Sequence, residues 1–247
     1  MLKKKDRYRS DKWLKNNDIY SWFRRGGFKA QGFGEAAFEG RPLIGICNSW
    51  SEPTHCNAHL RQLAEAVRRG VWQAGGFPLE FPVMSLGEYY MLPTTMLYRN
   101  LMSMDVEESI RANPLDGVVL LGGCDKTTPG LLMGAASANV PAILVTGGPQ
   151  LKGNWRGEEV GSCTDCRRYF TDLRAGTLAV EDWDDLQDNI LRSAGHCMVM
   201  GTASTMAVLA EALGIALPGN GAIPAVDSRR LQLAEAAGRK IVELVHE

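Results

Sequence analysis

Three cysteines follow short apolar runs, where thiol chemistry is expected. Cys56 comes after the apolar run 42–47, Cys124 comes directly after the run 117–121, and Cys197 precedes an expected helix. Thiolates bind iron and zinc. Loops at the carboxyl ends of parallel strands are where α/β folds bind their ligands. We therefore expect these three thiols to converge, although their spacing along the chain does not establish it.

The other cysteines give weaker signals. Cys163-x-x-Cys166 resembles a zinc or redox motif, but no second ligand pair lies nearby and the pair falls in a polar stretch. Buried cysteines without a chemical role are common, and we expect no metal or redox role for this pair or for Cys47. Cys56 stands at the expected start of a helix, where the helix dipole favours a thiolate.

Carboxylates and a lysine occupy the same kinds of loop. Glu88 and Asp125 follow strand candidates, and hard cations such as magnesium take oxygen ligands of this type. Taken singly, such a residue is more often a solvated loop acid or a helix cap. Lys126 is a candidate phosphate or carboxylate binder, a general base, or a surface lysine. His55, His59 and His196 flank two of the cysteines and suggest a zinc site, but they form no close-spaced ligand set.

Strands and helices that alternate along the chain must position these residues. Unbroken apolar strands separated by helices indicate an α/β protein with a mainly parallel sheet in a three-layer α/β/α arrangement. We predict strands at 42–47, 77–83, 117–121 and 142–146, and helices at 56–74, 93–112, 130–138, 181–194, 202–213 and 228–246. The polar stretch 152–166 is predicted to be a surface loop or lid.

The first 40 residues differ from the rest. They are polar, aromatic and glycine-rich, and we interpret 1–40 as an irregular arm with a short helix at 19–25 that packs on a partner subunit. Residues 41–247 form the α/β domain. The net charge of −1 gives no reason to expect nucleic acid or an anionic membrane as a partner. No apolar run approaches the roughly 20 residues that span a bilayer, and no signal peptide is recognisable, so we expect a cytoplasmic protein.

Several segments together resemble the family of dihydroxy-acid, phosphogluconate and aldonic acid dehydratases. The similarity runs in order from Arg41 to Ala225, and includes the stretches 55–60, 123–130 and 195–206. Within the family, 93–101 and 126–129 look like the L-arabinonate and D-xylonate dehydratases, which act on pentonates.

The resemblance implies roles for individual residues. Cys56, Cys124 and Cys197 match the family's three ligands of an iron–sulfur cluster, with [2Fe–2S] expected and [4Fe–4S] as the alternative. Glu88 and Asp125 match magnesium ligands. Lys126 matches a lysine of the catalytic centre that is carbamylated and becomes an oxygen ligand. The remaining cysteines match no ligand position.

The resemblance also implies the reaction. A sugar acid, expected to be a pentonate, loses water to give the 2-keto-3-deoxy acid, in a homodimer or homotetramer. Family members carry a second, mostly β domain with a further acidic ligand and a serine base, and the sequence to Glu247 does not contain it. A fragment or relative that keeps the metal-binding fold without turnover is therefore the alternative. A structural zinc protein is a third interpretation.

Replacing Cys124 by serine should sharply lower the iron bound by the chain, because a serine hydroxyl does not ionise as a thiol does. Cys163→Ser should leave the iron content unchanged. The measurement is iron and acid-labile sulfide after purification without oxygen. Equal loss in both variants would contradict the assignment of ligands.

Overall fold

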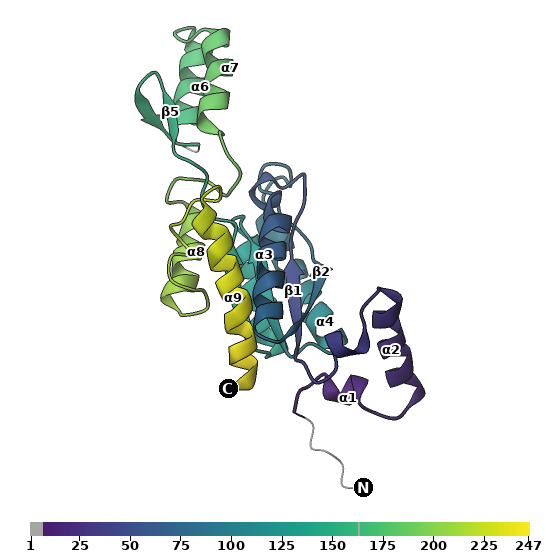
Figure 1. The fold of residues 1–247 in the computed structure, drawn as a ribbon. Coiled ribbons are helices and arrows are strands. Elements are labelled where there is room, and N and C mark those ends of the chain that lie inside the picture. Colours follow the sequence, from purple (N-terminus) through teal and green to yellow (C-terminus); the bar gives the residue numbers. More distant parts are fainter. Residues whose placement is uncertain (1–6, 163) are drawn as a thin grey trace.

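Four parallel strands form the centre of the molecule (Figure 1). The computed structural model describes residues 7–162 and 164–247, so Cys163 lies outside the described residues. The strands are β1 (Leu43–Asn48), β2 (Phe77–Pro82), β3 (Gly117–Gly122) and β4 (Ala142–Thr146), in the order β2-β1-β3-β4. All three pairings are parallel, which confirms the predicted sheet.

Helices cover both faces of this sheet, as the three-layer prediction required. α3 (Leu60–Gln73) and α9 (Ser228–His246) pack on one face, and α4 (Arg99–Ala112), α5 (Thr127–Ala138) and α8 (Thr202–Ala212) lie on the other. Successive strand residues point to opposite faces. Ile44 and Ile46 therefore join the α3–α9 core, while Cys47 joins the α4–α5 core. Burial on both faces explains why β1 and β3 are unbroken apolar runs.

Several helix boundaries in the structure differ from the predicted ones. The predicted helix 56–74 begins only at Leu60, after a short 3-10 turn, η2 (His55–Asn57). The predicted helix 93–112 is divided into a 3-10 turn, η3 (Thr95–Tyr98), and α4. The prediction for 228–246 is confirmed, since α9 spans those residues and its N-cap, Asp227, accepts a hydrogen bond from the backbone N–H of Arg229.

The arm is more ordered than its composition suggests. It contains α1 (Asp11–Leu14), α2 (Ile19–Ala30) and a 3-10 turn, η1 (Glu35–Ala37). α2 continues through two glycines beyond the predicted end at residue 25. Asp116 anchors the arm to the domain, because its carboxylate accepts hydrogen bonds from Ser10 N, Ser10 Oγ and Leu43 N at 2.7–2.8 Å.

A small subdomain projects from the body beyond the carboxyl ends of the strands (Figure 1). It consists of a hairpin of β5 (Gly153–Trp155) and β6 (Glu158–Val160), followed by α6 (Asp165–Ala175) and α7 (Val180–Ile190). The prediction of a loop at 152–166 was therefore wrong. Trp155 and Val160 pack against Leu186 and Ile190 of α7, and this distant apolar partner stabilises a hairpin whose own sequence is polar.

No helix in the described ranges is long and apolar enough to cross a membrane.

Gly70 permits the close packing of α3 on α9. An added Cβ at this position would lie 1.9 Å from the carbonyl oxygen of Glu235. We expect Gly70→Ala to lower the free energy of unfolding by about 1–3 kcal/mol, because backbone must move to admit the methyl group. Urea denaturation measures this change.

Gly26→Ala is the matched control, since Gly26 also lies within a helix but has nothing within 4 Å of the added Cβ. Alanine should stabilise the protein there by about 0.5–1 kcal/mol. A stabilising effect at Gly70 as well would contradict the close helix contact.

Candidate metal centre

The candidate centre lies where the sheet topology reverses direction. The chain passes from β1 outward to β2 on one side and then returns to β3 on the other side of β1. The loops after β1 and β3 therefore diverge, and the crevice between them is the usual ligand site of open α/β sheets. Cys56 lies in the loop after β1, and Cys124 follows β3.

The structure brings Cys56 and Cys124 together. Both side chains are buried, with 4% and 3% of their surfaces exposed, and their thiols are hydrogen-bond partners. Gly123 allows this approach, since a Cβ there would lie 2.9 Å from the carbonyl oxygen of Cys56. The predicted convergence is thus found for this pair of loops.

The pKa values of the two thiols are shifted in opposite directions. The hydrogen bond with Cys124 and burial together raise the pKa of Cys56. The same hydrogen bond lowers the pKa of Cys124, and the backbone N–H groups of Glu88 and Asp125, which also bond its sulfur, lower it further. The expectation that a helix dipole favours a thiolate at Cys56 therefore stays a prediction. α3 begins only at Leu60, and the partner that stabilises a thiolate lies in the other loop.

Lys126 joins the two candidate magnesium ligands. Its Nζ lies 3.3 Å from Glu88 Oε2 and 3.4 Å from Asp125 Oδ2. The Lys126 side chain is only 14% exposed, so the interpretation as a surface lysine was wrong. Because a Glu88 N–H also reaches the Cys124 sulfur, the carboxylates and the thiol pair form one continuous site.

Glu88 is held from its other side by two threonines. Thr94 Oγ1 donates to Glu88 Oε1 at 3.0 Å, and the backbone N–H and hydroxyl of Thr95 donate to Oε2. Burial acts to raise the pKa of Glu88, but the hydrogen bonds from Thr95 and Thr94 and the charge of Lys126 outweigh it and lower the pKa. Glu88 is therefore held as a carboxylate.

Two residues that the sequence interpretation missed lock these loops together. Thr127 Oγ1 donates to the carbonyl of Leu86 and accepts from the Leu86 N–H, which fixes the Glu88 loop to the start of α5. Asn57 Nδ2 donates to Ser85 Oγ at 2.8 Å and to the carbonyl of Ser49 at 3.1 Å. Only their positions next to Lys126 and Cys56 in the sequence could have drawn attention to them.

Cys197 approaches the centre from a third loop. Its Sγ lies 2.8 Å from the hydroxyl of Ser162, and it contributes, as the last of the named causes, to the raised pKa of Cys56. Within residues 7–162 and 164–247, however, no three His, Cys, Asp or Glu side chains are close enough together to hold a metal ion. The structure therefore pairs two of the three predicted thiols and leaves the third nearby.

The histidines bond mainly to backbone. His59 Nε2 lies 2.8 Å from the carbonyl oxygen of Gly147, and His196 Nδ1 lies 3.1 Å from that of Cys197. Burial lowers the pKa of His196 to about 4, so this ring is neutral. His55 Nε2 lies 3.5 Å from Cys56 Sγ and is the one histidine beside a candidate ligand thiol in the described chain.

The position of Cys166 differs from the one predicted for it. It lies in the first turn of α6 rather than in a polar loop, and its thiol donates to the carbonyl of Ser162. This bond places Cys166 beside the residue that contacts Cys197.

Fold and site define the class of this protein: a parallel α/β domain with paired thiols and lysine-bridged carboxylates at the switch point of its sheet. A family model described as dihydroxy-acid/6-phosphogluconate dehydratase N-terminal matches residues 41–247. The chain belongs to this family, which confirms the resemblance found in its sequence.

The sequences of individual dehydratases are similar to this chain and agree with the family assignment. The chain is 56% identical to an L-arabonate dehydratase of Azospirillum brasilense, 47% to a 6-deoxy-6-sulfo-D-gluconate dehydratase of Pseudomonas putida and 41% to a D-xylonate dehydratase of Caulobacter vibrioides. Each similarity covers 98% of this chain. The chain spans only 41–42% of the length of these relatives.

Thr95→Val should lower the free energy of unfolding at pH 7 by about 1–2 kcal/mol, because a donor to the Glu88 carboxylate is lost. A lowered carboxyl pKa stabilises the folded state above the ordinary value of 4.5, and this contribution disappears as the pH falls through the folded-state pKa. The difference from wild type should therefore shrink as the pH falls below 4.5. Urea unfolding at several pH values measures it.

Thr171→Val is the control, because its hydroxyl donates to the carbonyl of Arg167 rather than to a carboxylate. Its effect should not change over the same pH range. A Thr95→Val effect that is equally independent of pH would contradict the role given to Glu88.

Proposed function

We propose that this chain is the metal-binding part of an iron–sulfur dehydratase that converts an aldonate, and specifically a pentonate, to its 2-keto-3-deoxy acid. One observation carries the proposal. A buried thiol pair, Cys56 and Cys124, adjoins the carboxylates of Glu88 and Asp125 at the switch point of the sheet. Family membership and the names of the relatives support the reaction class.

The donor set fits the two proposed cofactors. Thiolates bind iron–sulfur clusters, and the environment already favours a thiolate at Cys124. Carboxylates suit magnesium, and both Glu88 and Asp125 face a cation, Lys126. Cys56, Cys124 and Cys197 would hold a [2Fe–2S] cluster, with [4Fe–4S] as the alternative. Glu88, Asp125 and a carbamylated Lys126 would hold Mg²⁺.

The bound cofactors would supply Lewis acidity toward the departing hydroxyl and the substrate carboxylate. The residues of the chain prepare this environment. Thr94 and Thr95 keep Glu88 ionised and oriented. Lys126, placed between two carboxylates, compensates their charge, and its carbamylation would replace this cation by a further oxygen ligand.

Ser204 is not proposed as the proton-abstracting base. Its hydroxyl donates to the carbonyl of Cys197 at 3.1 Å, so it helps to hold the Cys197 loop. We propose that the base and a further acidic ligand come from the part of the relatives' length that this chain does not span.

The second candidate is a non-catalytic protein with the same fold, and one observation favours it. The described thiols and carboxylates do not yet form a compact three-ligand site. Such a protein would keep the thiol pair and the lysine-bridged carboxylates without turnover. A structural zinc protein is distinguished from both by its metal content.

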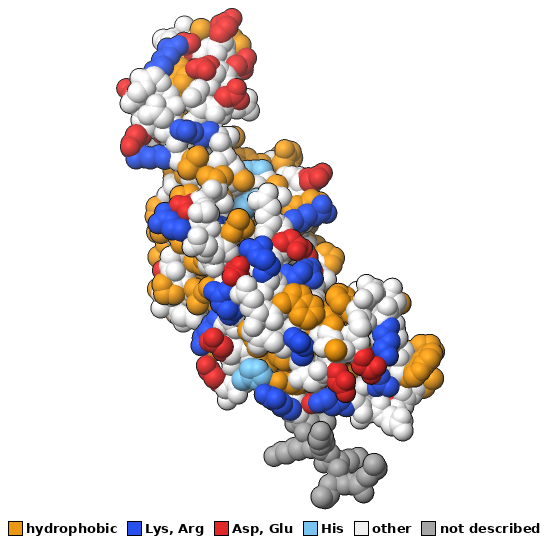
Figure 2. All heavy atoms as spheres, viewed as in Figure 1, with side chains coloured by type: hydrophobic (Ala, Val, Ile, Leu, Met, Phe, Trp, Pro, Cys, Tyr) orange, Lys and Arg blue, Asp and Glu red, His pale blue; other side chains and the backbone are white. Residues whose placement is uncertain are grey.

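We also propose that the protein is a homodimer or homotetramer. Tyr20, Trp22 and Phe23 on α2 are 60–68% exposed, and hydrophobic side chains are visible on the outer side of the arm in Figure 2. Apolar side chains gathered in this way mark protein contacts. A second copy of the chain is the proposed partner, and the sugar acid is the proposed small-molecule ligand.

The proposal is tested by measuring the metal content first and the dehydration activity second. The chain, purified without oxygen, should contain iron and acid-labile sulfide in near-equal amounts and absorb visible light. L-Arabinonate, D-xylonate and the sulfonated gluconate should then be assayed for formation of a 2-keto-3-deoxy acid. Because the proton-abstracting base is proposed to come from a region that this chain does not span, turnover is measured with that region present. Iron with turnover then supports the proposal, and iron without turnover under that condition supports the non-catalytic alternative. Zinc in place of iron would contradict both.

A further inference from the structure

A buried arginine lies behind the candidate centre and is not part of it. Arg230 of α9 is 0% exposed, and its guanidinium donates to three carbonyl groups: Thr146 at 3.2 Å, Asn220 at 2.9 Å, and Ile223. The charges of Glu211 and Asp227 act on Arg230, but neither carboxylate forms an ion pair with it in the described chain. Burying a charge without an ion pair is costly, so these carbonyl contacts must maintain an arrangement that the fold requires.

The carbonyl of Thr146 begins a short segment, 146–150, that leaves the end of β4. Arg230 fixes the start of this segment, and Asn220 Oδ1 accepts from the Thr146 N–H at 2.9 Å. Gly148 lies directly against the arginine, since an added Cβ there would be 2.7 Å from Arg230 Nε. The segment is therefore held from the α9 side.

The same segment touches all three cysteine loops. Gly147 N donates to the carbonyl of Gly122, which precedes the Cys124 loop. The carbonyl of Gly147 contacts His59, which is in the Cys56 loop. On the third side, His196 N donates to the carbonyl of Gly148 at 2.9 Å, and Gln150 N donates to the carbonyl of His196 at 2.8 Å.

Polar atoms without partners gather around this segment. Of seven such buried side-chain atoms in the described chain, five belong to residues within the segment or in contact with it: His59, Gln150, His196, Asn220 and Arg230. Buried polar groups normally find partners. This concentration marks an arrangement that is not optimised for stability alone.

We propose that Arg230 is the positioning residue that fixes segment 146–150 and thereby sets the spacing of the loops that carry Cys56, Cys124 and Cys197. It acts through the backbone and touches none of the thiols. The consequence for cluster assembly rests on the proposed function, whereas the geometric role does not.

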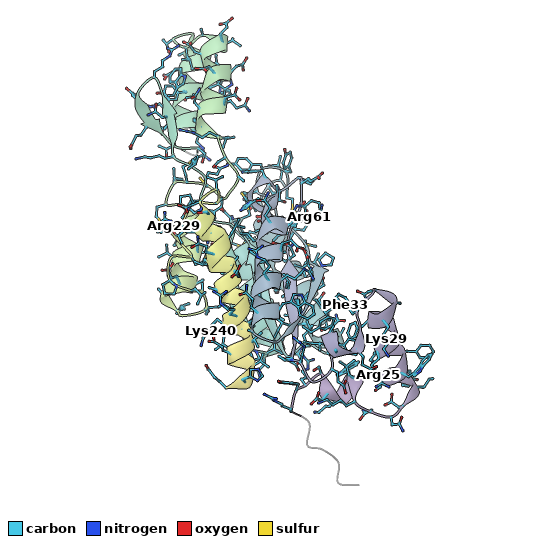
Figure 3. All side chains as sticks on the ribbon, in the orientation of Figure 1. Arg25, Lys29, Phe33, Arg61, Arg229 and Lys240 are labelled. Carbon is cyan, nitrogen blue, oxygen red and sulfur yellow. The ribbon has the colours of Figure 1, made fainter. Side chains whose placement is uncertain are left out.

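The test compares Arg230→Met, Arg230→Lys and Arg229→Met in the reduced full chain. Methionine keeps the bulk of the side chain without its donors, and lysine keeps a charge and a donor. Arg229, labelled in Figure 3, is the matched control on the same helix, because its side chain is 66% exposed and pairs, among the described residues, only with Asp227. Alkylation of each cysteine is followed by peptide mass spectrometry well below the unfolding temperature, and iron content is measured in parallel.

Arg230→Met removes three hydrogen bonds from a charged group. It should accelerate alkylation of Cys56 and Cys197 by at least about tenfold, the factor for the loss of a single such bond. Cys47 lies within β1 and should remain protected, because its burial does not depend on the loops. Arg230→Lys should fall between Arg230→Met and wild type, and Arg229→Met should match wild type.

Wild-type alkylation rates in Arg230→Met would overturn the inference. Parallel exposure of Cys47 would also overturn it, since that result means general loosening of the fold. If Arg230→Met does not fold, Arg230→Lys is compared with wild type by the same criteria. Altered alkylation in a chain that binds no iron would refute the proposed function alone, and unaltered alkylation in a chain that binds iron would refute this inference alone.

Discussion

The parallel pairing of β1 with β3 is the constraint on which the rest of the structure depends. The register places Asn48 beside Leu121, so the two strands end at the same edge of the sheet. Their loops then begin as neighbours, and Cys56 meets Cys124 although 68 positions separate them in the numbering. A slip by one residue would turn every side chain of a strand to the opposite face and disrupt both apolar cores. Core packing therefore fixes the site indirectly.

Hydrogen bonds rather than apolar contacts complete the site above this edge. Thr127 holds the Glu88 loop, Asn57 links the loops after β1 and β2, and the segment after β4 meets all three cysteine loops. Such contacts are directional, so they define distances between loops more sharply than packing alone. Arg230 belongs to the same system from the opposite side of the segment. The cost of burying its charge is understandable if loop geometry, rather than stability alone, is what it provides.

The distribution of charge across the site divides it into two connected halves. One half is a buried thiol pair in which Cys124 carries the lower pKa, and the other is a partly exposed group of Glu88, Lys126 and Asp125. The backbone N–H of Glu88 joins the halves. Soft ligands therefore lie deeper than hard ligands, an order that suits iron–sulfur and magnesium chemistry side by side. Cys197 contacts Ser162, which lies between β6 and α6 of the projecting subdomain.

The sequence by itself determined the strands, most of the helices and the identity of the candidate residues. Strands buried on both faces must be unbroken apolar runs, and α9 carries its own N-cap, so both signals are local. Only the tertiary structure decided the hairpin at 153–160, because its stability comes from Leu186 and Ile190 of α7. It likewise decided that Cys56 and Cys124 are neighbours and that Lys126 lies between two carboxylates. The physical reason is the same in each case: the deciding partner is distant in sequence and becomes a neighbour only when the sheet has formed.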